Sequence, residues 1–289
     1  MEYRVEAAHA GRRLRDVLRQ VMGVSYGAMK SAKWDGRITV NGVVTPVDAF
    51  VREGDMVAIR WKDAPVYQVK PYPLPLTIAY EDEHLFVIDK PAPLASQSSA
   101  NHPDDALENA LFSHLGCPPD YVYRPVNRLD KGTSGLMLVA KTPHAQHRLQ
   151  RLLHTEDFRR TYLAVVDGRL PASAGVIDAP IGKEDAASIR RIITPEGKPS
   201  VTRYEVVRAG ARRSLVRLVL ETGRTHQIRV HMAHMGCPVT GDFLYGTELS
   251  ALPGRFALHS HEVLLCHPLT GEKLHIVSPL PDALSALLD

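Results

Sequence analysis

The sequence predicts an α+β protein made of two modules joined by a short linker. Four prolines fall within DAPVYQVKPYPLPL, residues 63–76. Such a stretch does not fit a helix interior or a central strand, so it favours an extended spacer. Behind it, strand-like and helix-like segments follow one another without regular βαβ alternation, which favours a largely antiparallel sheet. We therefore expect a small α+β domain over residues 1–62 and a larger α+β domain over residues 77–289.

The first sixty residues predict two short helices followed by a small hairpin. Apolar residues recur at the spacing i, i+3, i+4 and i+7 from Leu14 to Val21, which indicates an amphipathic helix with arginines on its other face. A second helix is expected to begin with Ser25 as its N-cap. GRITVNG, residues 36–42, predicts a strand that ends in an Asn-Gly turn, and another turn precedes the strand MVAIRW.

Basic residues gather where the second predicted helix meets the hairpin: Lys30, Lys33 and Arg37. This pattern resembles the RNA-binding module named after ribosomal protein S-four, and residues 36–42 are the most specific part of the match. The resemblance implies that the first domain binds the phosphate backbone of RNA through these three residues. A small dimerisation or docking domain is the alternative.

The larger domain contains five segments typical of strands, in the order HLFVID, LMLVA, RTYLAVVDG, VTRYEVVRA and SLVRLVLE. Three helices are expected among them. One should begin at Asp104 or Asp105, and Pro143 should open the next. The third should cover THQIRVHMAHMG and end at Gly236.

Composition places the chain among ordinary soluble proteins. Charged residues make up 23% and the formal net charge is only +3, so the total charge permits nucleic-acid binding without demanding it. Arginines nevertheless cluster repeatedly along the chain, which favours a polyanionic partner. Three isolated cysteines, a polar N-terminus and the lack of a bilayer-length apolar run predict a cytoplasmic protein without membrane contact.

Several familiar catalytic motifs are missing from the sequence. GTSG, residues 132–135, lacks the spacing of a nucleophile elbow, and neither a phosphate-binding loop nor a dinucleotide fingerprint is present. His226, His231 and His234 lack zinc-protease spacing, and the pair His259 and His261 comes without a closed ligand set. We therefore expect no metal site, with these imidazoles hydrogen-bonded or facing RNA.

Two segments place charged side chains next to predicted core elements. In VNRLDKGTSG, Arg128 and Asp130 lie directly before a buried strand, where charges are costly unless paired. They therefore form either a structural pair or a site. In TGRTHQIRVHM, Arg224 lies where a helix begins, so its guanidinium can project from the helix N-terminus.

Four blocks of the larger domain carry a family resemblance: RLDKGTSGLMLVAKT, RRTYLAVVDG, TGRTHQIRVHMAHMGCPVTGDFLYG and LHSHEVLLCHPLTGE. In this order they resemble the pseudouridine synthases that modify large-subunit rRNA and tRNA. The resemblance implies a mixed, mostly antiparallel sheet with a central cleft that holds RNA. It also implies an isomerase that acts on specific uridines of structured RNA, rRNA rather than tRNA, without a cofactor. A monomer is favoured.

The resemblance assigns roles to individual residues. Asp130 matches the catalytic aspartate, Tyr162 the active-site tyrosine, and Arg224 the arginine that partners the aspartate. Arg128 matches the arginine that occupies the space left by a flipped base. Leu258 matches a position in the apolar wall of the pocket.

The sequence departs from the family pattern at two places. Asn127 stands where the block usually has histidine, and we expect its side chain to make the hydrogen bond of that position as a substrate-binding residue. Pro93 stands where a glycine is expected, in a loop that also lacks the usual His-Pro. These departures concern substrate contacts and leave the catalytic block intact.

The implied residues suit the isomerisation. The reaction breaks the bond from ribose to a ring nitrogen and joins the sugar to a ring carbon, without redox change or net hydrolysis, so it requires no cofactor. Ionised Asp130 would attack the anomeric carbon or abstract a ribose proton, and a neighbouring arginine would keep it ionised. Tyr162 would stack on the uracil and help remove a proton from the new bonding carbon. Arg128 would offset part of the cost of flipping the base.

Two other functions compete with this reading. A non-catalytic RNA-binding or ribosome-assembly factor of the same fold would have no need to retain Asp130, Tyr162 and Arg224 together. A glycosidase-type hydrolase would need a second catalytic carboxylate, which the matched blocks do not supply. It would also release free uracil.

Overall fold

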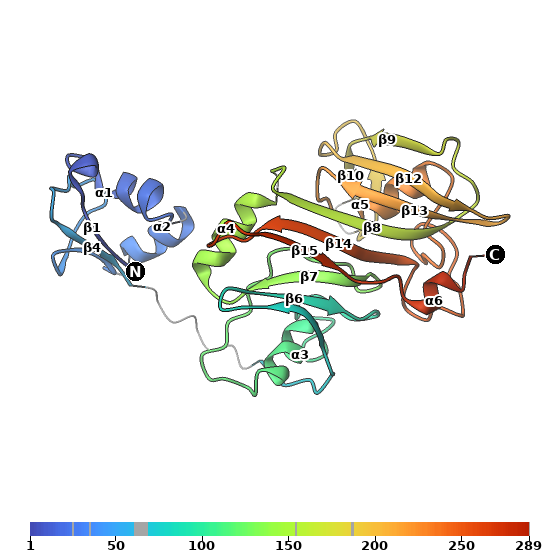
Figure 1. Cartoon of the computed structure of the whole chain (residues 1–289), viewed down its shortest axis with the longest axis horizontal. Coiled ribbons are helices and arrows are strands. Elements are labelled where there is room, and N and C mark those ends of the chain that lie inside the picture. Colours follow the sequence, from blue (N-terminus) through green and yellow to red (C-terminus); the bar gives the residue numbers. More distant parts are fainter. Residues whose placement is uncertain (25, 35, 61–68, 154, 186–187, 289) are drawn as a thin grey trace. The chain divides into compact units, whose positions relative to one another are not determined.

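The computed structural model describes residues 1–24, 26–34, 36–60, 69–153, 155–185 and 188–288, with the backbone alone at residue 31. The chain divides into two units, Met1–Gln68 and Val69–Asp289 (Figure 1). The predicted cap Ser25 and the first half of the proline-rich segment lie outside the described residues. In the second half, Tyr72 and Leu74 pack on the main core of the larger unit. Residues 69–76 therefore belong to that unit and not to a spacer.

The smaller unit consists of a four-stranded antiparallel sheet with helical segments. Its strands lie in the order β1 (Glu2–Arg4), β4 (Met56–Ile59), β2 (Ile38–Val40) and β3 (Val43–Val44). The helical segments are η1 (Ala7–His9), the continuous pair α1 (Leu14–Asp16) and η2 (Val17–Val21), and α2 (Tyr26–Trp34).

The predicted apolar face of the first helix and the predicted Asn-Gly turn are confirmed. Leu14, Val17 and Leu18 are fully buried, as the apolar face of the first helix requires. Asn41 and Gly42 join β2 to β3 with φ angles of 51° and 81°. Positive φ at both central residues is what a tight hairpin turn of this kind needs, and Asn-Gly tolerates it best.

The larger unit contains a nine-stranded sheet. Eight strands lie side by side in the order β5 (Thr77–Glu81), β6 (Leu85–Lys90), β7 (Ser134–Ala140), β14 (Leu258–Cys266), β8 (Phe158–Asp167), β13 (Arg213–Leu220), β12 (Val201–Ala209) and β9 (Ala174–Asp178). The ninth, β15 (Lys273–Val277), pairs with β14. Only β7 and β14 are parallel, so the predicted mixed, mostly antiparallel sheet is confirmed. A separate hairpin consists of β10 (Ile181–Lys183) and β11 (Arg191–Ile193).

Alternate side chains of the central strands enter two cores. On β6, Phe86 and Ile88 pack into the main core, to which α3 (Leu107–His114) and α5 (Gln227–His234) contribute. Leu85 and Val87 enter a second core that includes residues of α4 (Pro143–Leu152). This period of two identifies strands buried on both faces.

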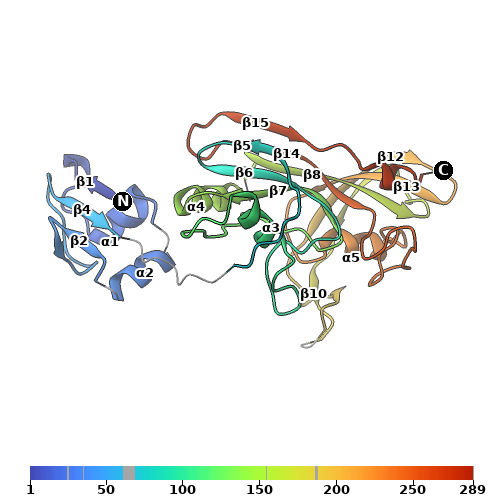
Figure 2. The same ribbon diagram turned by 90° about the horizontal axis from the view of Figure 1, so that it is seen from below.

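Figure 2 shows α3 and α5 on the same side of the sheet. The short helix α6 (Asp282–Ser285) follows β15.

The start of α3 differs from the prediction. The helix begins at Leu107 with Ala106 as its N-cap, not at Asp104 or Asp105. Asp104 instead pairs with Lys70, 2.7 Å away, and Asp105 with His102. The side chain of Asn109 accepts the N–H of Ala106 and thereby caps the helix from inside its first turn.

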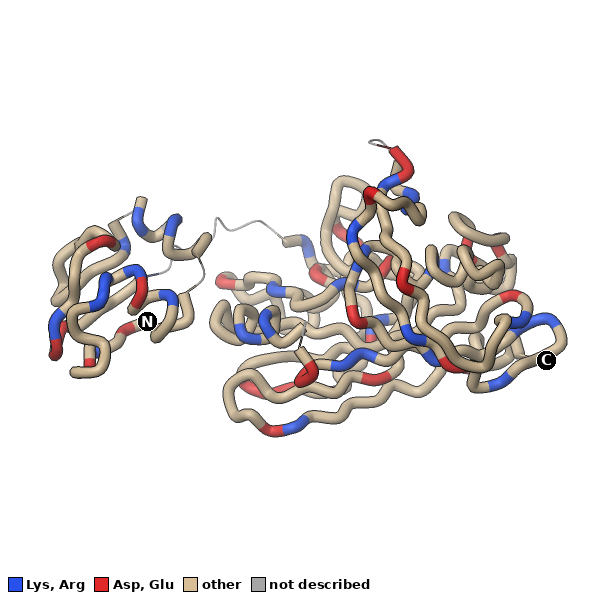
Figure 3. The backbone as a smooth tube through the Cα atoms, turned by 90° about the horizontal axis from the view of Figure 1, so that it is seen from above, with Lys and Arg blue, Asp and Glu red and all other residues tan. Residues whose placement is uncertain are grey.

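Positions of Lys and Arg are interspersed with positions of Asp and Glu along the backbone of both units (Figure 3). The overall distribution therefore marks no single binding face. None of the helices in the described part of the chain has the length and apolar character that crossing a bilayer requires.

Candidate active site

A cleft of about 460 Å³ opens in the larger unit. Four stretches line it: residues 95–97, residues 126–131 ahead of β7, the first half of β8 with Arg160 and Tyr162, and residues 223–229 leading into α5. Leu258, the first residue of β14, also lines it. This volume falls in the usual range for ligand pockets.

Glycines position the loop that carries Asp130. Gly135 follows the loop with φ 103°, and a Cβ atom there would lie 2.2 Å from the backbone oxygen of Ser260 on β14. A Cβ on Gly132 would lie 2.7 Å from the ring of Phe256. Only glycine allows the loop to lie so close to the neighbouring backbone and ring. Thr133 N–H donates to the Asp130 carbonyl at 3.0 Å and closes the turn.

The carboxylate of Asp130 is paired with Arg229. Arg229 Nη1 donates to Asp130 Oδ2 at 3.0 Å, and the Asp130 side chain remains 28% exposed at the cleft. The other side of the guanidinium is held by Asp242: Nε donates to Oδ2 at 2.7 Å and Nη2 to Oδ1 at 2.8 Å. The fork of Arg229 is therefore fixed by a fully buried carboxylate and directs its remaining Nη1 at Asp130.

Aromatic rings complete the setting of Arg229. The guanidinium lies 4.2 Å from the ring centroid of Phe256 and 5.0 Å from that of Tyr245. Burial opposes its charge, but the hydrogen bonds and charges of Asp242 and Asp130 outweigh burial and raise the pKa of Arg229. A permanent cation therefore lies against the carboxylate of Asp130.

His226 is the second basic group near Asp130. It precedes α5 in the left-handed region, with φ 59°, and its Nε2 lies 4.0 Å from Asp130 Oδ2. Its Nδ1 is hydrogen-bonded to the hydroxyl of Tyr245 at 2.9 Å. Burial is the main cause that lowers the pKa of His226 below its usual value. The imidazole is therefore neutral at pH 7, and Arg229 supplies the positive charge.

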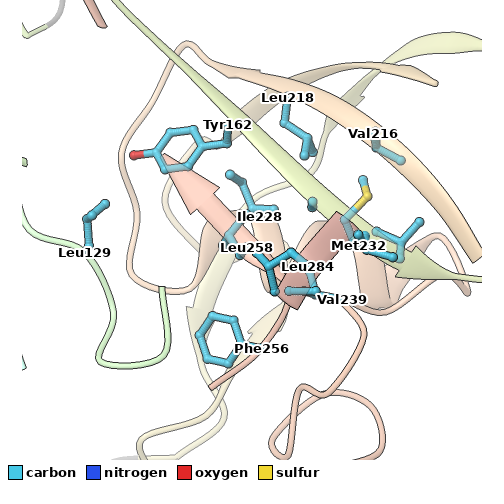
Figure 4. Packing of buried hydrophobic residues seen from close by; sticks show 14 of the residues in the cluster. Leu129, Tyr162, Val216, Leu218, Ile228, Met232, Val239, Phe256, Leu258 and Leu284 are labelled. Atoms are coloured by element: carbon cyan, nitrogen blue, oxygen red, sulfur yellow. The ribbon is translucent and has the colours of Figure 1, made fainter. Parts of the chain in front are cut away.

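Tyr162 and Leu258 supply the apolar part of the cleft. They come from the neighbouring strands β8 and β14, and each is 4% exposed. Figure 4 shows the ring of Tyr162 extending toward Leu129, with Ile228 and Leu258 close by. A planar ring among aliphatic side chains offers a surface on which another flat ring can stack.

The comparison with known proteins identifies the family of the chain. Residues 84–234, just over half of the chain, match the family model described as RNA pseudouridylate synthase. The chain belongs to this family. An uncharacterised RNA pseudouridine synthase of Bacillus subtilis is 38% identical over 92% of this chain and 95% of its own length. A ribosomal large subunit pseudouridine synthase D of Pseudomonas aeruginosa is 38% identical over 94% and 89%.

Solved structures agree with the sequence relatives. The human RNA pseudouridylate synthase domain containing 1 is 27% identical and aligns with a TM-score of 0.61, over 74% of this chain and 88% of the human one. The expected family, the fold class and the isomerase class are thus confirmed. The protein is an enzyme of the RNA pseudouridine synthase family, and its partner is RNA.

The predicted pairing of Arg224 with Asp130 is wrong. Arg224 lines the cleft but is exposed, and its Nε donates to the carbonyl of Pro199 at 3.2 Å. Arg224 lies in the turn ahead of α5. Arg229 lies inside the helix and lines the cleft, where it contacts Asp130. The segment TGRTHQIRVHM did contain a pattern that favours Arg229. Arg229 stands between the apolar residues Ile228 and Val230, both buried, and a charge among buried residues requires an acidic partner.

Asn127 lines the cleft, so its expected contact with the substrate stays a prediction. It is 8% exposed, and its Oδ1 accepts the N–H of Leu138 on β7 at 2.9 Å. Through Oδ1 the side chain ties the loop that carries Asp130 to the sheet, while its Nδ2 has no hydrogen-bond partner among the described residues. Arg128, the next residue, is exposed at the cleft as the base-flipping role requires.

The remaining predicted residues lie in the smaller unit, outside this cleft. Lys30 and Lys33 are exposed on α2. Arg37 precedes β2, is half-buried, and donates through Nη1 to the carbonyl of Arg60 at 3.1 Å. Its guanidinium is thus partly engaged within the unit.

The candidate metal histidines are hydrogen-bonded inside the protein. His259 contacts Ser134 Oγ through Nδ1 at 2.9 Å, and His261 contacts the carbonyl of Ser278 at 2.6 Å. Within the described ranges no three His, Cys, Asp or Glu side chains are arranged to hold a metal ion.

Proposed function

We propose that the protein converts specific uridines of structured RNA, in rRNA rather than tRNA, to pseudouridine with Asp130 as its catalytic carboxylate. The observation that carries this proposal is the setting of Asp130, which is open to a nucleoside-sized cleft yet fixed by Arg229. Relatives named for the large ribosomal subunit match along nearly their whole length, which supports rRNA as the substrate.

The charge of Asp130 is central to either chemical route. As a nucleophile the carboxylate attacks the anomeric carbon, and as a base it abstracts a ribose proton. Both routes require the ionised form to survive when a nucleobase covers it and excludes water. Arg229 donates to the carboxylate from 3.0 Å and is held in that position by Asp242, so a guanidinium stays beside Asp130 when the base covers it.

Tyr162 receives the detached uracil in this proposal. Its ring is fixed on β8 among apolar neighbours, so stacking lets the base rotate while remaining in the cleft. The bond from the anomeric carbon to the ring nitrogen breaks, and the bond to the ring carbon forms. That carbon then loses its proton and the nitrogen gains one, and Tyr162 assists the removal.

The uridine must leave its stack before it can enter the cleft. Flipping a base costs a few kcal/mol, least for bases that are already unpaired. Arg128 is exposed beside the catalytic loop, where its planar guanidinium can fill the gap in the RNA helix. We assign it this role.

The substrate proposal is tested with unmodified transcripts of large-subunit rRNA, small-subunit rRNA and a tRNA pool. Each is incubated with the full chain, and pseudouridine is mapped chemically. We expect pseudouridine at one or a few positions of the large-subunit transcript, with free uracil remaining at background. Modification confined to tRNA would contradict the choice of RNA, and release of uracil would favour a hydrolase.

We also propose that the smaller unit is an S-four-like module that binds RNA through α2. Lys30 and Lys33 are exposed on this helix, and Tyr26 and Trp34 on the same helix are 61% and 75% exposed. Lysines suit phosphates, and exposed aromatic rings suit unpaired bases. Arg37, at the start of the hairpin, borders this surface in sequence.

Charge variants of α2 test this module. Replacing both Lys30 and Lys33 with Gln should weaken RNA binding and reduce the slope of log K against log salt by about 1.8, or 0.9 for each lost phosphate contact to a duplex. Arg4 and Arg52 are equally exposed in the same unit but lie on β1 and a turn. Their double replacement with Gln is the matched control, and an equal change in slope there would count against α2.

A further inference from the structure

Arg160 on β8 is a buried cation that faces the cleft. Its residue is only 9% exposed, and it lines the same cavity as Asp130 and Tyr162. Its one contact with a charged, polar or aromatic group in the described part of the chain is with the ring of Phe158, whose centroid lies 5.6 Å from the guanidinium carbon. No carboxylate or carbonyl accepts from it there.

The other buried Lys and Arg side chains among the described residues are fully partnered. Arg229 is shared by two carboxylates, and Lys90 donates to the carbonyls of Pro91 and Leu94 at 3.0 and 2.8 Å. Arg160 lacks such partners, and its nitrogens are not among the fully buried unpaired atoms, so the solvent of the cleft still reaches its guanidinium. The anion that suits Arg160 must therefore arrive from outside.

The strand geometry places this cation at the substrate. Residues 160 and 162 point to the same face of β8, roughly 6.6 Å apart along the strand. The pairing of β8 with β13 ends at Thr161, whereas its pairing with β14 continues to Phe158, so Arg160 lies where the sheet parts. A Cβ on Gly223 would lie 3.4 Å from Arg160 Nη2, so the guanidinium lies against the opposite wall of the cleft.

Asp130 is the only acidic residue among the described residues that line the cleft. Besides Arg160, four Lys and Arg residues line it: Arg128, Lys131, Arg224 and Arg229. Because Arg229 already satisfies Asp130, the remaining positive charge is available to a polyanion. A guanidinium fork matches two oxygens of a phosphate.

We propose that Arg160 binds a backbone phosphate of the RNA strand whose uridine occupies the cleft. This inference rests on the proposed function, because it takes the RNA strand to enter beside Tyr162. It adds a phosphate subsite about one nucleotide step from the stacked base. Binding there would fix the ribose over Asp130 while the base turns.

The test is a cycle between protein and RNA variants. A synthetic hairpin containing a uridine that the wild-type chain modifies is prepared with single neutral methylphosphonate linkages around that uridine. Binding is measured in an Asp130→Asn background, so that the RNA stays unchanged. We expect one neutral linkage to weaken binding about 10- to 100-fold, the range for a charge-assisted contact, and Arg160→Gln to weaken it by a similar factor. Combined, the two changes should weaken binding little beyond either alone.

Arg159 provides a matched control on the same strand. It precedes Arg160, is exposed and does not line the cleft. Arg159→Gln removes the same charge but should keep full sensitivity to the neutral linkage. If Arg159→Gln and Arg160→Gln weaken binding equally, or if Arg160→Gln still responds to every neutral linkage as the parent does, the proposal is overturned.

Stability separates this role from a structural one. Without RNA, Arg160→Gln should melt at the same temperature as the parent or higher, because no side-chain hydrogen bond or ion pair to a described residue is lost. Arg160→Lys keeps the charge without the fork and should retain part of the affinity. A large drop in melting temperature in both variants would make Arg160 structural and overturn the proposal. If the wild-type chain modifies no RNA at all, the proposed function fails instead, which the turnover assay shows by itself.

Discussion

Replacing Asp130 with Asn separates catalysis from structure. The change keeps the size of the side chain and removes its charge. Arg229 then loses one charged acceptor but keeps both hydrogen bonds to Asp242, so the buried guanidinium remains neutralised. We expect a loss of stability of about 1.5–3 kcal/mol, the value of one charge-assisted hydrogen bond, and not the roughly 3–5 kcal/mol that follows when a buried charge is left alone.

Activity should respond very differently. Without a carboxylate neither nucleophilic attack nor proton abstraction can occur, so the rate of pseudouridine formation should fall by more than about 10³-fold. The assay combines single turnover of uridine-labelled RNA, RNA binding and a thermal melt. A folded variant that binds RNA and makes no pseudouridine supports the assignment. Turnover near the wild-type rate would refute it.

Asp242→Asn is the structural counterpart. Asp242 is fully buried, holds two nitrogens of Arg229, and also accepts the N–H groups of Leu244 and Tyr245. Its neutralisation should cost about 3–5 kcal/mol. Activity should then be lost in step with the fold. If Asp130→Asn instead behaved like Asp242→Asn, Asp130 would be a structural partner of the arginine.

Four other outcomes follow from the geometry. Arg224→Ala should keep a single-turnover rate near wild type, since its guanidinium does not contact Asp130; a loss as large as that of Asp130→Asn would restore the original pairing. Arg128→Ala should slow modification of a structured hairpin more than of a short unstructured strand, because flipping costs a few kcal/mol only where the base is stacked; equal losses would exclude the flipping role. Deleting residues 1–62 should leave a folded, weakly active unit with a shallower salt dependence of RNA binding; an insoluble fragment would disprove that independence. Burial lowers the pKa of His231 below its unfolded value, so its stabilising effect is present above about pH 6.5 and is lost as the pH falls. The free energy of unfolding, measured with urea between pH 7 and 5, should fall with decreasing pH more steeply in the wild type than in His231→Gln. The difference in slope should reach up to about 1.4 kcal/mol per pH unit.

Local patterns in the sequence were sufficient to predict elements whose formation depends on a few neighbouring residues. The strand over residues 136–140, the Asn41–Gly42 turn and the end of α5 at Gly236 depend on apolar runs and backbone freedom within a few residues. The loop that places Asp130 at the cleft is also local, because Asp130 and the glycines after it form one short motif. The fold class followed from the order of such segments.

Contacts between distant segments set the limit of prediction. The parallel pairing of β7 with β14 joins Ser134 to His259, far apart in the sequence, and no local pattern encodes it. The choice between Arg224 and Arg229 depends on where the first turn of α5 begins and on Asp242 behind it. Asn127 shows the same limit, because its Oδ1 accepts the backbone N–H of Leu138 on β7, a partner that no side-chain pattern indicates.

The two buried arginines of the cleft show how the site divides its charge. Arg229 has both of its anions within the chain, so its position does not depend on substrate. Arg160 has none among the described residues and reaches the solvent of the cleft, so its charge has no ionic partner until a phosphate arrives. An interaction that forms only with bound RNA strengthens RNA binding and does not stabilise the free protein. Replacing Arg160 should therefore move stability and RNA affinity in opposite directions, whereas replacing the anchor of Arg229, Asp242, should lower both.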